Sequence, residues 1–451
     1  MKAQRTTAGA ALPRTPTTHA AHAAALDADD ELAPLRREFE LPSDGRRRLT
    51  YLCGHSLGLM PRRARSDVRA ELDRWGRRAV EGHFSGDGGW FAYHQRFSAP
   101  LARLVGAAPE EVVAMNTLTA NLHLMLVSFY RPTAERYKIL IERDAFPSDR
   151  YAVQSQIRFH GRDPRDALLE LAPEPGSWML DVARLEALLA AEGERIALLL
   201  LPGVQYLSGQ ALDIGRITSL AHRHGCVVGF DLAHSIGNVP LALARDGADF
   251  AVWCSYKYLN AGPGAVAGAF VHRKWHGSDL PRFEGWWGHA AERRFAAERA
   301  FSPMPGAEAW QLSNPPILSL APLAASLELF ERAGLERLRA KSERLTGYLE
   351  LLLRETLGER CEILTPAAPS QRGCQLSVRL QTAVAHFDGA DRDGQDEPAR
   401  HDGPRGTAEA LRTAGIVADW RGDVLRLAPV PLYNRFRDVL AAVRALRRVL
   451  E

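Results

Sequence analysis

Short apolar runs alternate with amphipathic stretches between residues 110 and 272, and this alternation restricts the possible folds more than any other feature. Strands that are each followed by a helix predict a mostly parallel sheet covered by helices on both faces. The expected strands are 112–115, 137–141, 167–171, 196–201, 226–230 and 250–254, with one more strand returning at 265–272. The expected helices are 118–129, 149–160, 181–191 and 213–224.

The pattern changes after Asn314, where two long helical patterns open a second, smaller α+β domain at residues 315–451. Residues 111–314 are the expected large domain, and residues 31–110 are an N-terminal segment that precedes it. The C-terminal elements that we expect are helices 315–332, 335–357, 406–414 and 436–450 and strands 375–380 and 424–428. The predicted fold is therefore α/β with a smaller C-terminal domain joined by a long helix.

Composition is that of a soluble globular protein, with 46% hydrophobic and 25% charged residues. A net charge of +3 gives no reason to expect a nucleic-acid partner, and no run of 18 apolar residues predicts a membrane span. The five cysteines are scattered without a CxxC pair, which favours reduced thiols in a cytoplasmic protein over disulfides or a zinc site. We expect residues 1–30 to be a disordered tail, although the first 26 also suit a transit peptide, and 388–404 to be a solvated insertion.

Two ionisable residues end successive predicted strands. Asp231 closes one apolar run, and Lys257 follows the next one, flanked by Tyr256 and Tyr258. In open α/β sheets ligands bind beyond the carboxyl ends of the strands, so both side chains belong to the binding edge. A lysine that can attach covalently and a carboxylate that keeps a ring nitrogen protonated suit pyridoxal phosphate (PLP), which acts as an electron sink. A lone lysine at a strand end is usually a surface residue, so the prediction depends on the pair.

Further polar residues lie where they can complete such a site. His234, three residues after Asp231, can lie against the same ring, although a strand-ending Asp can also simply cap a helix. Thr119 lies at the start of a predicted helix, whose free N–H groups can bind a phosphate with help from its hydroxyl; the alternative is an ordinary helix cap. In Phe146-Pro147-Ser148-Asp149, Phe146 can stack on a pyridine ring and Asp149 can reach it, or Phe146 belongs to the core and Ser148 caps a helix.

Several segments together resemble kynureninases, from about residue 49 to the C-terminus with an interruption at the insertion. The Asp–Lys pair alone indicates only a PLP enzyme of the aminotransferase fold, whereas the combination of segments is much more specific. The segments that carry the resemblance are 51–59, 115–119, 146–149, 231–234, 254–262, 285–289, 313–317 and 428–434.

The resemblance implies a fold-type I PLP enzyme that hydrolyses the Cβ–Cγ bond of L-kynurenine, and in many members also of 3-hydroxykynurenine, in tryptophan catabolism. It also implies a homodimer with sites at the interface, where Trp286 and Asn314 come from the partner, and substrate-site loops within residues 31–110. Lys257 and Tyr256 are the implied catalytic residues, Tyr256 as a proton donor. The implied cofactor-binding residues are Leu118, Thr119, Phe146, Pro147, Ser148, Asp149, Asp231, His234, Tyr256, Lys257, Trp286 and Asn314. The implied substrate-binding residues are Ser56, His83, Asn314 and Arg426, with Arg426 pairing with the α-carboxylate.

Two positions depart from the pattern, and two other functions stay open. His55 stands where Asn is common, and Pro202 stands where some members have a hydroxyl. A cysteine desulfurase or aminotransferase would share the fold, but neither Cys361 nor Cys374 lies in a flexible glycine-rich loop. A catalytically silent protein of this fold is the other alternative. A Rossmann dehydrogenase is disfavoured, because no G-x-G-x-x-G follows the first strand.

Overall fold

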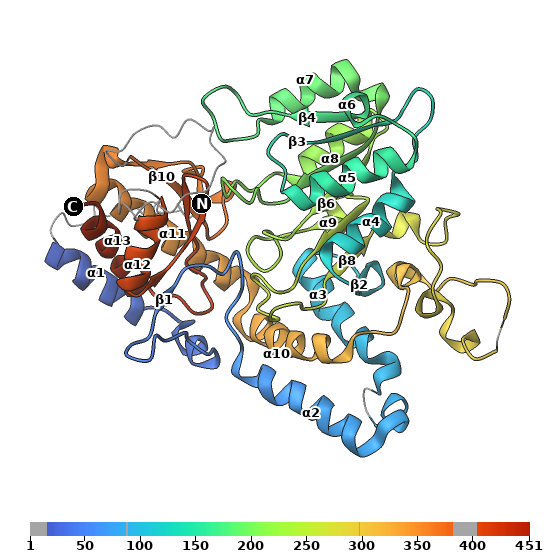
Figure 1. The fold of residues 1–451 in the computed structure, drawn as a ribbon, viewed down its shortest axis with the longest axis horizontal. Helices are drawn as coiled ribbons and strands as arrows, with labels where there is room; N and C mark the ends of the chain where they lie inside the picture. Colours follow the sequence, from blue (N-terminus) through green and yellow to red (C-terminus); the bar gives the residue numbers. More distant parts are fainter. Residues whose placement is uncertain (1–15, 87–88, 297, 382–403) are drawn as a thin grey trace, which may run out of the picture.

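A computed structural model describes residues 16–86, 89–296, 298–381 and 404–451. Figure 1 shows a large α/β part on one side and a smaller α+β part on the other, with the long helix α10 (Ile317–Ala333) running beside both. We call these parts the large and the small domain.

The large domain is built on a seven-stranded sheet with the strand order β2-β8-β7-β6-β5-β3-β4. Every strand is parallel to its neighbours except β8, which runs antiparallel between β2 and β7. The sheet confirms the predicted parallel architecture and its returning strand. Its strands are β2 (Val112–Ala114), β3 (Lys138–Glu142), β4 (Leu168–Leu171), β5 (Ile196–Pro202), β6 (Val227–Asp231), β7 (Phe250–Trp253) and β8 (Gly268–Val271). The predicted helices are α4 (Leu118–Phe129), α5 (Pro147–Phe159), α7 (Val182–Glu192) and α8 (Ile214–Arg223).

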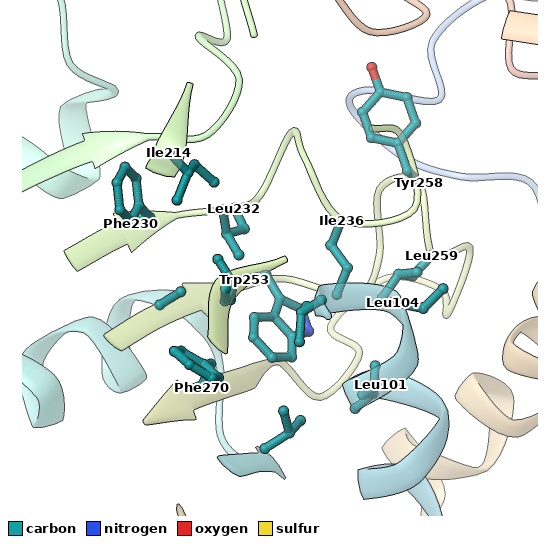
Figure 2. Close-up of a cluster of buried hydrophobic side chains, with 14 of the residues drawn as sticks. Leu101, Leu104, Ile214, Phe230, Leu232, Ile236, Trp253, Tyr258, Leu259 and Phe270 are labelled. Carbon is teal, nitrogen blue, oxygen red and sulfur yellow. The ribbon is translucent and has the colours of Figure 1, made fainter. Parts of the chain in front are cut away.

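Central strands contribute large side chains to the core on one face of the sheet. Figure 2 shows Trp253 and Phe270 facing Leu101 and Leu104 of helix α3 (Ser98–Val105). All four are at most 5% exposed, in accord with apolar runs that are buried on both faces of a parallel sheet. A Cβ at Gly268 would lie 2.3 Å from the Trp253 indole, so the strand beside this tryptophan requires glycine. The packed sheet gives the strand ends a rigid base.

The small domain contains a four-stranded antiparallel sheet, in the order β12-β13-β10-β9, and a two-stranded parallel pair, β1-β11. Apolar side chains from its sheet and its long helices form a separate core cluster. The strands are β1 (Thr50–Tyr51), β9 (Cys361–Ile363), β10 (Leu376–Leu380), β11 (Ile416–Val417), β12 (Asp419–Arg421) and β13 (Val424–Leu427). The helices are α11 (Leu335–Leu357), α12 (Pro404–Thr413) and α13 (Phe436–Leu450).

The expectation of a disordered tail at residues 1–30 is wrong for its second half, because Pro16–Ala28 forms helix α1. Ala23 is fully buried in the small-domain core, and Asp27 accepts a hydrogen bond from the Phe436 N–H (2.7 Å) at the start of α13. Tertiary contacts therefore order an alanine-rich stretch with little amphipathic pattern of its own. Residues 1–15 lie outside the described residues, as does the predicted insertion except for residue 404.

The predicted N-terminal segment 31–110 is shared between the domains. Its strand β1 pairs with β11 of the small domain, whereas α2 (Arg62–Arg78) packs along α10. Within the part of the chain that the structure describes, no helix is both long and apolar enough to cross a membrane.

Candidate active site

The carboxyl ends of β3, β5 and β6 meet at one edge of the sheet, and a cavity opens there. Most of the residues predicted for the cofactor lie around it, including the lysine and the aspartate on which the prediction depended. The residues that line this cavity are Leu118, Thr119, Glu142, Phe146, Ser148, Asp149, Pro202, Val204, Tyr206, Asp231, Ala233, His234, Tyr256 and Lys257.

The Lys257 amine has an aromatic and imidazole environment. Its Nζ lies 3.0 Å from His234 Nε2 and 5.7 Å from the centre of the Phe146 ring. Burial, and then the positive charge of Lys257, hold the pKa of His234 well below its usual range, so this imidazole is neutral. Its Nδ1 is buried and has no hydrogen-bond partner in the described ranges of the chain. A neutral imidazole thus holds the lysine through Nε2 and has one nitrogen left for a ligand.

Three buried carboxyls face the same cavity. Asp231 accepts a hydrogen bond from the Ala233 N–H (2.7 Å), and burial raises its pKa while Lys257 lowers it. Burial and the neighbouring Asp231 raise the pKa of Asp149 well above its ordinary value, and its Oδ1 is buried without a partner. Burial also raises the pKa of Glu142 to about 8. Buried acids that cluster at one edge of a cavity suit a ligand that brings a protonated ring nitrogen.

Two helix N-termini converge on the other part of the cavity. Thr119 and Ser148 lie in the first turns of α4 and α5, and their hydroxyl oxygens are 2.7 Å apart. Neither helix has a side-chain cap, and Pro147 occupies the first turn of α5, where its missing N–H costs nothing. Uncapped N–H groups with two hydroxyls are suited to a phosphate. Together with the lysine and the carboxyls, they fit PLP.

Tyr256 lies beside the lysine in the same cavity. Burial and the adjacent Cys254 raise its pKa above the usual value, so that the phenol keeps its proton at neutral pH. This tyrosine can therefore act as a proton donor.

Arg426 lies on β13 of the small domain and is only 2% exposed. Its Nη1 donates to the Tyr206 carbonyl (2.8 Å) and its Nη2 donates to the Asp419 carboxylate, while its Nε is buried and no described residue accepts from it. Tyr206 is in turn packed edge-to-face on Phe146 at 5.4 Å. The arginine thus connects to the cofactor cavity through Tyr206 rather than lining it.

Within one chain, the remaining predicted residues do not line the cavity. Trp286 is 44% exposed and Asn314 is exposed; their segments lie side by side, because the Trp287 N–H donates to the Leu312 carbonyl (3.2 Å). His83 packs edge-to-face on Trp90 (5.3 Å) in an aromatic cluster near Trp286. Ser56 lies in the turn closed by its own N–H and the Cys53 carbonyl (2.8 Å).

Sequence reasoning missed three residues of this region. Glu142 ends β3 as Asp231 ends β6, so the same rule about strand ends would have found it. Tyr206 lies in the loop after β5, and Asp419 opens a three-residue strand. Neither of these two has a local sequence signal, because their importance comes from contacts with Arg426.

Comparisons with known proteins agree with this geometry. Residues 93–389 match the aminotransferase class-V family model, and residues 338–446 match the kynureninase C-terminal domain model. The chain is 55% identical to the kynureninase of Xanthomonas campestris pv. campestris (strain B100) and 54% identical to that of Stenotrophomonas maltophilia (strain K279a). Both alignments cover 93% of this chain and 95% of the relative.

Solved structures with the same fold are more distant in sequence. A C-DES mutant with glycine covalently linked to the PLP cofactor superposes with a TM-score of 0.74 at 18% identity, over 91% of this chain and 98% of that one. A cysteine desulfurase of Escherichia coli gives 0.71 at 17% identity, over 93% and 98%. At such identities the likeness shows the fold alone. The family models and the close relatives show that the chain belongs to the kynureninase family of PLP-dependent, aminotransferase class-V enzymes.

Proposed function

We propose that this protein is a PLP-dependent hydrolase that cleaves the Cβ–Cγ bond of L-kynurenine to give anthranilate and L-alanine, as a step of tryptophan catabolism. The observation that carries the proposal is the cavity that brings Lys257, His234, Asp231 and Asp149 together in a chain with close kynureninase relatives. 3-Hydroxykynurenine is the second expected substrate.

The residues of the cavity have separate tasks. Bound PLP supplies an electron sink for the charge that develops next to the substrate amine. Lys257 holds the cofactor and then takes the α-proton, with His234 Nε2 3.0 Å from its amine. Asp231, supported by Asp149, keeps the ring nitrogen protonated. Water adds to the γ-ketone and supplies an oxygen of the anthranilate carboxylate. Tyr256, whose phenol stays protonated at neutral pH, donates its proton to the β-carbon as the Cβ–Cγ bond breaks.

Arg426 is the proposed partner of the substrate's α-carboxylate. Its Nε is buried and has no partner within the described part of the chain, as an incoming carboxylate requires. A planar guanidinium recognises a carboxylate through two parallel hydrogen bonds, which fixes the amino acid in register.

A desulfurase is less well supported, because its chemistry needs a reactive cysteine. Cys374 is fully buried, and burial raises the pKa of both Cys374 and Cys361 to about 12. Thiols of this kind are poor nucleophiles.

We further propose a cytoplasmic homodimer in which each chain contributes Trp286 and Asn314 to the other's site. Both residues are exposed, on adjacent surface segments, in a single chain. Mixing an inactive Lys257→Ala chain with an inactive Trp286→Ala chain tests this. Activity that reappears on mixing supports shared sites, and its absence from a mixture shown to contain heterodimers refutes them.

Anthranilate fluorescence tests the main proposal. The purified holoenzyme is given L-kynurenine, 3-hydroxykynurenine and, separately, L-cysteine with detection of sulfide. Anthranilate release with no sulfide is the expected result. Sulfide release without anthranilate would overturn the proposal in favour of a desulfurase.

A further inference from the structure

His55 and Asp419 form a buried pair next to Arg426. His55 is fully buried in the segment 53–58, and its Nε2 lies 3.2 Å from Asp419 Oδ2. The same Oδ2 accepts the hydrogen bond from Arg426 Nη2. One carboxylate oxygen therefore binds an imidazole and a guanidinium at once. The reaction outlined above makes no use of this pair.

The protonation states of His55 and Asp419 decide which of the two donates the hydrogen bond. Burial lowers the pKa of His55 to about 4, with the charges of Arg426 and Lys257 acting in the same direction and Asp419 acting against them. The hydrogen bond from His55 and the charge of Arg426 hold the pKa of Asp419 well below its usual range, against the effect of burial. The imidazole is thus neutral and the Asp419 carboxylate is ionised. His55 donates its Nε2–H to Oδ2, and its Nδ1 is buried with no hydrogen-bond partner among the residues described.

Asp419 competes with any carboxylate ligand for Arg426. A carboxylate and a guanidinium prefer a fork of two parallel hydrogen bonds, which here would engage Nε as well as Nη2. In the structure Asp419 accepts from Nη2, and Nε has no partner among the residues that the structure describes. The hydrogen bond from His55 occupies part of the acceptor capacity of Asp419. It also restrains the Asp419 carboxylate from rotating to accept from both Nε and Nη2 of Arg426.

We propose that His55 is a positioning residue of the substrate-carboxylate site, which holds Asp419 on one oxygen so that Arg426 keeps N–H groups for the substrate's α-carboxylate. The inference deepens the proposed function and rests on it, because it takes Arg426 as the carboxylate partner. A glutamine amide can donate a similar hydrogen bond, because its Nε2 lies about as far from the backbone as the imidazole Nε2, whereas asparagine is shorter.

The test compares His55→Ala, His55→Gln and a control, His222→Ala, in the holoenzyme. His222 also pairs with a buried aspartate, Asp249 (2.8 Å), but lies on α8, outside the cavity. The ligands are L-kynurenine and its decarboxylated analogue, which keeps the aryl ketone and the amine. The measurements are KM, kcat, the inhibition constant of the analogue and the absorbance of bound PLP.

For His55→Ala we expect KM for L-kynurenine to rise roughly tenfold or more, as for the loss of a hydrogen bond to a charged group. The kcat, the inhibition constant of the analogue and the PLP absorbance should change less than threefold. His55→Gln should restore most of the loss, and His222→Ala should match the wild type. Equal weakening of both ligands, or a fall in kcat at constant KM, would overturn the inference.

A double-mutant cycle with Asp419→Asn tests the link through Asp419, with His55→Leu, which leaves a smaller cavity, in place of His55→Ala if that variant does not fold. In that background the competing charge is gone, so adding His55→Ala should leave KM unchanged, because coupled residues give non-additive effects. A full additional tenfold loss there would refute the link through Asp419. If the wild type itself releases no anthranilate, the proposed function fails and this inference fails with it, whereas normal wild-type turnover isolates the role of His55.

Discussion

Replacing Glu142 by Gln should make the stability of the protein less sensitive to pH. Glu142 is 3% exposed, its Oε1 accepts from Gln205 Nε2 at 3.3 Å, and its Oε2 is buried with no donor among the described residues. Burial raises its pKa from 4.5 to about 8. Because the folded pKa lies above the unfolded one, the folded state binds more protons between these values. Stability is therefore lost as pH rises from about 4.5 to about 8 and is constant above that range.

The size of the effect follows from the shift. A rise from 4.5 to about 8 corresponds to about 5 kcal/mol lost across the window. An unfolding entropy of roughly 2 cal/mol/K per residue over 451 residues converts this into about 5 °C in Tm. Gln has the size and the polarity of Glu but does not titrate, so the variant should not lose stability through this residue as the pH rises.

Thermal unfolding followed by circular dichroism between pH 5 and pH 9 is the assay, on the cofactor-free and the PLP-loaded protein. The Tm of Glu142→Gln minus that of the wild type should increase with pH and level off above about pH 8. Glu174→Gln is the matched control, because that glutamate is exposed. Parallel Tm curves for the wild type and Glu142→Gln would refute the assignment of a proton to this carboxyl.

Three other substitutions test the cofactor site. Lys257→Ala should lose the visible absorbance of lysine-bound PLP together with turnover, and full activity would disprove its role. Tyr256→Phe should keep the cofactor spectrum while kcat falls roughly 10²–10⁴-fold, the usual contribution of general acid–base catalysis; unchanged kinetics would remove the tyrosine from the mechanism. Thr119→Val should weaken PLP binding about tenfold, measured by fluorescence titration, because it removes a hydroxyl from the phosphate end; unchanged affinity would show that this hydroxyl does not contact the phosphate.

Long periodic elements could be predicted from the sequence with good accuracy. Helices α4, α11 and α13 have the same bounds in the structure as in the sequence-based prediction, because their apolar positions repeat over three or more turns. Strands β9, β11 and β12 have only two or three residues, too few for a periodic pattern, and they were missed. Helix α1 was missed because its order depends on packing against α13.

The residues of the site likewise fall into those that a sequence rule predicts and those whose role depends on tertiary contacts. Lys257 and Asp231 could be predicted because strand ends meet at one edge of a parallel sheet, which is a rule of topology. Asp419 could not, because its role depends on Arg426 and His55, the latter 364 residues away in the chain. Trp286 remains a prediction, because a single chain does not bring it to the cavity.

The segment 53–58 also joins the two domains at the site. At one end Cys53 forms an isolated parallel β-bridge with Ala428, two residues after Arg426. At the other end the Gly58 N–H donates to the carbonyl of Tyr256 (2.8 Å), the residue before Lys257. A Cβ at Gly58 would lie 2.3 Å from the Lys257 carbonyl oxygen, so this close contact requires glycine. The six residues of this segment therefore set the distance between the Arg426 guanidinium and the Lys257 amine. An inserted residue would alter that distance. The ligand would then need a different separation between its amine and its carboxylate to reach both the lysine and the arginine.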